Sequence, residues 1–285
     1  MEKYALELNG VIKQYKDFKL DNISFTVPQG SIVGLIGENG AGKSTTINAI
    51  LGLIKKDSGT IRILGEQDIE TVCKDNLGVV FDGNNYPDTL TPNQLGNVFK
   101  NIYSSWYNKT YISMLEKFKL PLNKKIKEFS KGMKMKYSIS VAFSHHSKLL
   151  ILDEATSGLD PIMRDEILDM LLDFIQDEEN SILVSSHITS DLEKIADYIV
   201  FIHEGKIIFQ KPKDELLENY GIIKCGASLF DEINKDDIIA YRKQDYEWQV
   251  LIENKQLAQK KYPTAMIVPA SIDEIMLMYV KGDVK

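Results

Sequence analysis

The stretch GENGAGKST, residues 37–45, decides how the surrounding chain folds. Residues 31–36 before it form an apolar run typical of a strand, and residues 46–53 after it are compatible with a helix. Glycines let successive backbone N–H groups curl around phosphate oxygens, and a helix N-terminus adds partial positive charge at the same place. The order strand, glycine-rich loop and helix therefore predicts a phosphate-binding loop (P-loop) with a nucleotide ligand.

The residue types within this loop indicate how a nucleotide is held. The Lys43 ammonium can reach the terminal phosphates, and the Ser44 hydroxyl can bind Mg²⁺. The predicted nucleotide-binding residues of the loop are Gly37, Asn39, Gly40, Ala41, Gly42, Lys43, Ser44 and Thr45.

Two carboxylates follow a second apolar run. Residues 149–154 read LLILDE, which predicts a buried parallel strand that ends in Asp153 and Glu154. Ligands of open parallel sheets collect at the carboxyl ends of the strands. Asp153 suits a place near Mg²⁺, and Glu154, one residue further, suits a general base that activates the water attacking the γ-phosphate. His187 ends another apolar run, residues 181–186, but a lone histidine at a strand end is usually structural.

Two short segments narrow the class of nucleotide-binding protein. They are FSKGM, residues 129–133, at an apparent helix start, and SGLD, residues 157–160. With the P-loop, the LLILDE strand and His187, they form a set that resembles the nucleotide-binding subunits of ATP-binding cassette (ABC) transporters, in particular of bacterial exporters. The resemblance covers roughly Tyr4 to Pro212. It implies an ATPase that uses ATP and Mg²⁺, dimerises around two ATP molecules and drives a separate polytopic membrane subunit.

The resemblance also implies roles that the residue types alone leave open. An aromatic residue at the place of Tyr15 stacks on adenine, and the histidine at the place of His187 hydrogen-bonds the γ-phosphate and orients the attacking water. The signature segment Ser130, Lys131, Gly132 and Met133 binds the nucleotide of the opposite subunit in trans. Asp160 belongs to a loop at the dimer contact. The second ATP-binding subunit is either an identical or a different chain.

The chain departs from the family pattern at three positions. Lys131 and Met133 replace the usual glycine and glutamine of the signature, while Ser130 and Gly132 are kept. Lys131 either adds positive charge near phosphate or faces solvent. Asp82 stands where the family usually has a glutamine, and because both side chains offer oxygen, the expected metal ligands are Ser44, Asp82 and Asp153.

Composition and length limit the class of protein further. At 285 residues with 44% hydrophobic residues the chain can form two domains, and no apolar stretch approaches the roughly 18–20 residues that cross a bilayer. The N-terminus lacks a signal-peptide pattern, and Cys73 and Cys225 lie too far apart for a zinc or disulfide motif. A net charge of −7 argues against a nucleic-acid partner. We therefore expect a cytoplasmic protein held at the inner face of the membrane by its membrane subunit.

The motif positions predict an α/β fold: a P-loop NTPase core with an antiparallel β-subdomain, a helical subdomain at about residues 84–145, and a small C-terminal α+β domain. The expected domains are residues 1–220 and residues 221–285, the second without catalytic residues and with an accessory or regulatory role. Thr91-Pro92-Asn93-Gln94 and Ser271-Ile272-Asp273-Glu274 predict capped helix starts. Tyr246, Trp248, Val250 and Ile252 alternate with Glu247, Gln249 and Leu251, which predicts a strand with one strongly apolar face and one mixed face.

Two other functions fit parts of this pattern. One is a non-transport ABC ATPase acting on ribosomes or DNA, although such translation factors usually carry two cassettes and the chromosome-type ATPases insert a long coiled coil between P-loop and signature. The other is a nucleotide-dependent regulatory or immunity module. A copurifying polytopic membrane protein would distinguish a transporter subunit from both.

Overall fold

The structure is a computed structural model that describes residues 4–67, 69, 72, 74–83 and 86–284. The chain divides into two compact units, Met1–Gln210 and Lys211–Lys285. The predicted boundary at about residue 220 assigns residues 213–219 to the first domain. In the structure these residues form α7 (Lys213–Asn219), which belongs to the second unit. No helix in the described part of the chain is both long and apolar enough to span a membrane.

A six-stranded sheet forms the centre of the first unit, with the order β5-β6-β7-β3-β8-β9. Its strands are β3 (Ile32–Ile36), β5 (Leu77–Val80), β6 (Leu149–Asp153), β7 (Ser181–Ser186), β8 (Tyr198–His203) and β9 (Lys206–Pro212). The pairs from β5 through β8 are parallel. Every residue of β3, β6 and β7 is buried, which explains why these strands are mainly apolar in the sequence.

An antiparallel sheet of three strands packs its apolar face into the same core. It contains β1 (Tyr4–Gln14), β2 (Lys19–Pro28) and β4 (Ser58–Ile63), in the order β2-β1-β4. Ile23, Phe25 and Val27 of β2 are buried, as their alternation with polar residues predicts. The core cluster joins them to residues of β3, β6 and β7, so the two sheets share one hydrophobic core. This packing fixes the carboxyl ends of the parallel strands, where the site lies.

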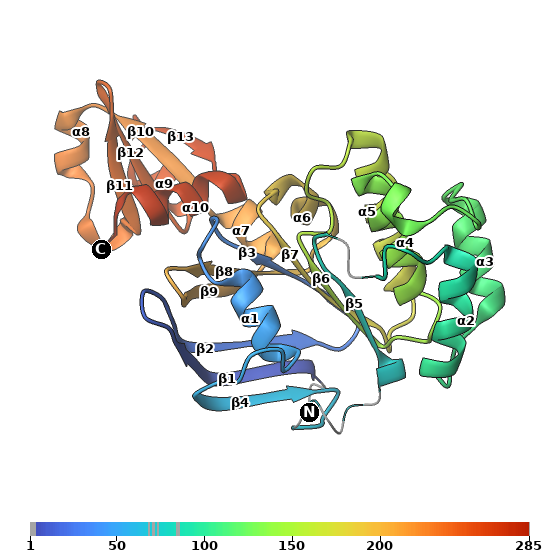
Figure 1. The fold of residues 1–285 in the computed structure, drawn as a ribbon. Helices are drawn as coiled ribbons and strands as arrows, with labels where there is room; N and C mark the ends of the chain where they lie inside the picture. Colours follow the sequence, from blue (N-terminus) through green and yellow to red (C-terminus); the bar gives the residue numbers. More distant parts are fainter. Residues whose placement is uncertain (1–3, 68, 70–71, 73, 84–85, 285) are drawn as a thin grey trace. The chain divides into compact units, whose positions relative to one another are not determined.

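The helices of the first unit are α1 (Lys43–Ile50), α2 (Pro92–Ile102), α3 (Asn108–Lys117), α4 (Lys131–Ala142), α5 (Pro161–Phe174) and α6 (Thr189–Ile195). Figure 1 shows α2, α3 and α4 grouped beside the β5 edge of the six-stranded sheet as the predicted helical subdomain. The capping box predicted at Thr91 and Gln94 is present at the start of α2. Tyr111 of α3 is fully buried, and its hydroxyl donates to the carbonyl of Pro92, at the start of α2, at 2.8 Å.

The second unit has its own five-stranded antiparallel sheet, in the order β13-β10-β12-β11-β14. Its strands are β10 (Gly221–Cys225), β11 (Ala240–Gln244), β12 (Glu247–Ile252), β13 (Met266–Pro269) and β14 (Asp283–Val284), and its helices are α7, α8 (Ala227–Glu232), α9 (Lys255–Lys261) and α10 (Ile272–Lys281). The capping box predicted at Ser271 and Glu274 begins α10. This unit is the predicted small α+β domain.

One expectation for the second unit is wrong. Tyr246 does not join the apolar face of β12: it lies in the turn before the strand and is 98% exposed. Leu251 and Gln249, expected on the mixed face, are both buried. β12 is paired along its two edges by β10 and β11, and the burial of the successive residues Val250, Leu251 and Ile252 shows that both of its faces are covered. The Arg242 guanidinium donates to the buried Gln249 amide oxygen at 2.6 Å.

Candidate active site

The loop between β3 and α1 has the geometry that a P-loop requires. Gly40 and Gly42 have φ of +84° and +115°, a region that favours glycine, and Gly42 is the N-cap of α1. A Cβ atom on Gly37 would lie 2.4 Å from the Ile202 carbonyl oxygen. The loop therefore accepts no side chain at Gly37, because β8 passes directly beside it.

Lys43 lies inside this loop rather than in solvent. Its side chain is almost fully buried, and its ammonium donates to the carbonyls of Gly37 at 2.8 Å and Glu38 at 3.3 Å. The same ammonium lies 3.3 Å from Oε1 of Glu154. These contacts hold one positive charge at the mouth of the loop, against the carboxylate that the sequence identified as the candidate base.

Glu154 occupies a strained backbone conformation with φ of +54°. Its N–H lies 3.2 Å from the Ser185 carbonyl oxygen and 3.1 Å from the Ser185 hydroxyl, which hold the turn after β6. The second carboxylate oxygen of Glu154 lies 2.5 Å from Nδ1 of His187. Glu154 therefore bridges Lys43 and His187, two residues that the sequence separates by 144 positions.

Asp153 is held by the neighbouring strand. Its side chain is 8% exposed, and the Ser185 hydroxyl donates to its Oδ1 at 2.6 Å. Asp153 and Ser185 are direct partners in the β6–β7 pairing. Sequence reasoning missed Ser185; the only signal for it is that the apolar run of residues 181–186 ends in two serines.

A hollow of about 610 Å³ collects half of the predicted site residues. Those that line it are Asn39, Gly40, Gly42, Lys43, Ser44, Thr45, Asp82, Glu154 and His187. Phe18 and Ser157 also line it, and neither was predicted. Residues from five separate parts of the sequence thus face one hollow at the carboxyl ends of β3, β5, β6 and β7.

Tyr15, the predicted partner of adenine, is not among the residues that line the hollow. Tyr15 is 40% exposed, and the Lys13 ammonium lies 5.6 Å from its ring centroid. Phe18, three residues further along the same connection, is the aromatic residue of the hollow wall. A Cβ atom on Gly42 would lie 3.0 Å from the Phe18 ring, so this ring packs directly against the P-loop.

The signature segment begins α4, as predicted, and does not line the hollow of its own chain. The Ser130 hydroxyl caps the helix by accepting from the N–H of Met133 at 3.2 Å. Asp160 caps α5 in the same way, accepting from the N–H of Met163 at 3.0 Å. A Cβ atom on Gly132 would lie 2.6 Å from the Met163 sulfur, so the starts of α4 and α5 pack against each other.

The oxygen ligands of the hollow suit Mg²⁺. No group of three or more His, Cys, Asp or Glu is arranged to hold a metal within the described residues. Mg²⁺ is usually bound by one or two carboxylates together with substrate phosphates, and it keeps several waters. Ser44 and Asp82 of the hollow, with Asp153 beside it, are donors of this kind and fit a cation that enters with a nucleotide.

The other histidines are not among the residues that line this hollow. His145 is buried and stacks on Tyr103 with ring centroids 4.0 Å apart, and burial lowers the pKa of its imidazole. His203 is partly buried, with Nδ1 2.8 Å from Oε1 of Glu38. Cys225 is a buried free cysteine whose thiol pKa is raised by burial, and Cys73 lies outside the described residues.

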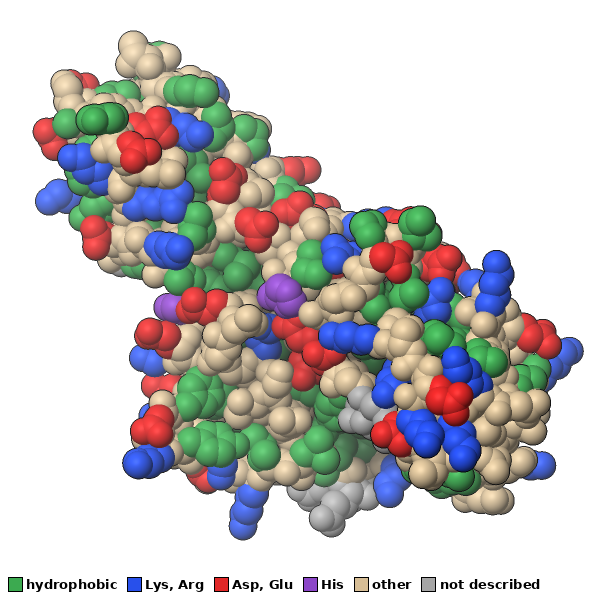
Figure 2. Space-filling view, turned by 45° about the horizontal axis from the view of Figure 1, so that its top comes forward, with side chains coloured by type: hydrophobic (Ala, Val, Ile, Leu, Met, Phe, Trp, Pro, Cys, Tyr) green, Lys and Arg blue, Asp and Glu red, His purple; other side chains and the backbone are tan. Residues whose placement is uncertain are grey.

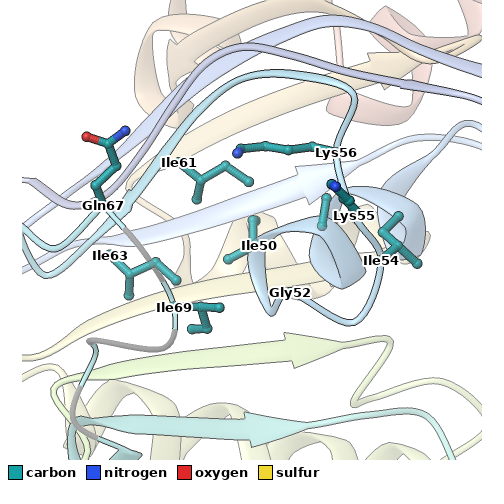
Figure 3. Close-up of a pocket in the computed structure, with 10 residues that line it drawn as sticks. Ile50, Gly52, Ile54, Lys55, Lys56, Ile61, Ile63, Gln67 and Ile69 are labelled. Atoms are coloured by element: carbon teal, nitrogen blue, oxygen red, sulfur yellow. The ribbon is translucent and has the colours of Figure 1, made fainter.

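A second hollow of about 250 Å³ lies beside the end of α1 (Figure 3). Isoleucines from α1, β4 and the segments after them line it, together with Lys55, Lys56 and Gln67. None of the predicted site residues contributes to it, so the chemistry is concentrated at the first hollow.

The comparisons with known proteins agree with this geometry. The family model described as "ABC transporter" matches residues 20–157. The ABC transporter ATP-binding protein YtrB of Bacillus subtilis (strain 168) is 32% identical over 228 residues, which are 79% of this chain and 76% of YtrB. The bacitracin transport ATP-binding protein BcrA of Bacillus licheniformis is 34% identical over 216 residues, 74% of this chain and 71% of BcrA.

Solved structures show the same fold. A structure described as the ATP binding subunit of an ABC transporter has 28% identity and a TM-score of 0.66, covering 75% of this chain and 92% of that chain. The predicted fold class, the ATPase activity and the use of ATP with Mg²⁺ are confirmed by these relatives. The chain belongs to the ATP-binding subunits of ABC transporters.

Proposed function

We propose that Glu154 is the general base that activates water for attack on the γ-phosphate of ATP. The observation that carries this proposal is its position: the carboxylate lies 3.3 Å from the Lys43 ammonium and 2.5 Å from His187 Nδ1, at the wall of the hollow. A general base must lie within reach of the reacting water and be oriented by its neighbours. The strained backbone at Glu154, fixed by Ser185, supports such an orienting role.

The surrounding residues have complementary tasks in this proposal. The N–H groups of the P-loop and the Lys43 ammonium bind the phosphates, and Lys43 exchanges part of its contact with Glu154 for phosphate oxygen. His187 orients the Glu154 carboxylate through Nδ1, and we assign its other ring nitrogen to the γ-phosphate. Mg²⁺, when bound, neutralises charge on the phosphates, and Ser44, Asp82 and Asp153 are the residues that would hold it.

We further propose that two chains complete each site. The signature segment, residues 130–133, does not line the hollow of its own chain. Ser130 caps the N-terminus of α4, and a helix N-terminus is suited to bind phosphate. One chain carries a P-loop side and a signature side, so two copies placed head to tail supply two full sites. Asp160, at the start of α5 beside Gly132, would lie at the same contact.

We propose export as the direction of transport. Relatives of this chain include the bacitracin transport protein BcrA and the lantibiotic transport protein SrtF of Streptococcus pyogenes, which is 35% identical over 212 residues. We propose that this chain acts at the inner face of the membrane with a polytopic membrane subunit, and without a nucleic-acid partner. The helices described between P-loop and signature are α2 and α3, of 11 and 10 residues, which does not favour a chromosome-type ATPase with a long coiled coil.

Light scattering on the purified chain tests the proposed dimer. Glu154→Gln with Mg-ATP should trap a species of about twice the 32.4 kDa chain mass, because each ATP then binds the P-loop of one chain and the signature segment of the other at once. Lys43→Ala in the Glu154→Gln background is the control and should stay at the mass of one chain. A Glu154→Gln protein that binds ATP yet keeps the mass of one chain would contradict the dimer of identical chains.

A further inference from the structure

Two departures from the family pattern contact each other in this structure. The Lys131 ammonium, in the signature segment, lies 2.9 Å from Oδ1 of Asp82, which follows β5. Asp82 lines the nucleotide hollow of the same chain, whereas Lys131 does not. The pair therefore joins the start of α4 to the wall of that hollow.

The path of the Lys131 side chain is set by a glycine. A Cβ atom on Gly158 would lie 3.4 Å from Lys131 Nζ and 3.8 Å from its Cδ and Cε, so the stem passes over Gly158. Gly158 has φ of +71°, which favours glycine at that point. Lys131 thus reaches Asp82 across the loop that leads to α5.

The charge of this pair matters because of what enters the hollow. ATP brings several negative charges, and Asp82 places another carboxylate at the wall beside Glu154. Coulomb repulsion between Asp82 and the phosphates opposes nucleotide binding unless the Asp82 charge is compensated. Lys131 supplies that compensation at hydrogen-bonding distance.

We infer that Lys131 is a positioning residue that acts in cis: it holds and neutralises Asp82 in the nucleotide site of its own chain. This inference rests on the proposed nucleotide site but not on dimer formation. It gives the signature segment a second task beside the contact with the other chain. Both side chains are about half exposed, 49% and 46%, so solvent screens the pair and its effect is modest.

Lys134 provides a matched control for the loss of positive charge. Residues 124–136 contain six lysines, and Figure 2 shows Lys and Arg side chains gathered on the right, over the part of the first unit where Figure 1 places α2, α3 and α4. Lys134 lies on the same helix as Lys131, but its ammonium lies 3.9 Å from Asp88, which does not line the hollow. Lys134→Gln removes the same charge from the same helix without touching Asp82.

The test is a double-mutant cycle on nucleotide affinity. A fluorescent ATP analogue is titrated in EDTA, at protein concentrations where the chain is monomeric, against Lys131→Gln, Asp82→Asn and the double variant. Lys131→Gln should weaken affinity about two- to fivefold, the range of an exposed ion pair. In the Asp82→Asn background the same substitution should have nearly no effect, and Lys131→Arg should preserve wild-type affinity.

The outcomes separate this inference from the proposed function. Equal losses for Lys131→Gln in both backgrounds, or equal losses for Lys131→Gln and Lys134→Gln, would overturn the cis role, because the lysine would then act only through general charge. Failure of Lys43→Ala to reduce affinity would instead contradict the proposed nucleotide site itself. Circular dichroism spectra identical to wild type ensure that each comparison is made between folded chains.

Discussion

Ser185→Ala should damage both stability and catalysis, although Ser185 does not line the hollow. The Ser185 hydroxyl donates to Asp153 at 2.6 Å and lies 3.1 Å from the N–H of Glu154, and the serine is fully buried. Alanine leaves the 8%-exposed Asp153 carboxylate without this donor. Loss of a buried hydrogen bond to a charged group costs about 1.5–3 kcal/mol.

The assay compares thermal unfolding and steady-state ATP hydrolysis. A loss of about 2 kcal/mol lowers the midpoint of a unit this size by about 4–8 °C. Because Asp153 and Glu154 both lose a support, turnover should fall about 10–100-fold, as for other residues that hold metal-site carboxylates. Nucleotide affinity in EDTA should change little, since the P-loop is untouched.

Ser181→Ala is the matched control. Ser181 is also a buried serine of β7, but it lies at the other end of the strand, where its hydroxyl accepts from the N–H of Gly30 at 3.2 Å. It should lower stability without a comparable loss of turnover. If Ser185→Ala retained as much activity as Ser181→Ala, the assignment of Ser185 as the support of the two carboxylates would be refuted.

Three further predictions follow from the structure. Phe18→Ala should weaken ATP affinity more than Tyr15→Ala in equilibrium titrations, because Phe18 lines the hollow and stacking on a base is worth roughly 1–3 kcal/mol; the reverse order would favour Tyr15 as the adenine partner. The free energy of unfolding should fall as pH drops below about 6.5, because burial lowers the pKa of His145 and the unfolded chain then binds the proton more readily than the folded chain. The variant His145→Phe, which keeps the stacking on Tyr103, should flatten this pH dependence when denaturation is measured at a series of pH values. A chain ending at Gln210 should bind ATP with nearly unchanged affinity but differ in dimerisation or basal turnover if the second unit is regulatory, and identical light scattering and activity would exclude that role.

Much of the core could be predicted because buried parallel strands and capped helices leave strong local signals. β3, β6 and β7 are mainly apolar runs, and Thr91, Ser130 and Ser271 begin helices where the sequence placed them. These features depend on neighbours within a few residues. The family resemblance then gave the roles of residues far apart in the chain.

The features that sequence reasoning missed depend on contacts between distant segments. Ser185 supports Asp153 only because β6 and β7 pair in one register, and no local pattern encodes that register. Tyr246 fits the alternation of β12 but lies in the turn before the strand, next to Asp245, whose φ is +52°. The ion pair of Lys131 with Asp82 joins residues 49 positions apart, and each looks like an isolated departure in the sequence.

The rate of γ-phosphate release by Glu154→Gln tests the central claim most directly. Glutamine keeps the shape of the side chain and removes the base, so a nucleotide titration should still show binding. The account predicts that phosphate release falls about 10²–10⁴-fold relative to the unmodified chain. A Glu154→Gln protein that binds ATP and releases phosphate at the wild-type rate would contradict the assignment of Glu154 as the general base.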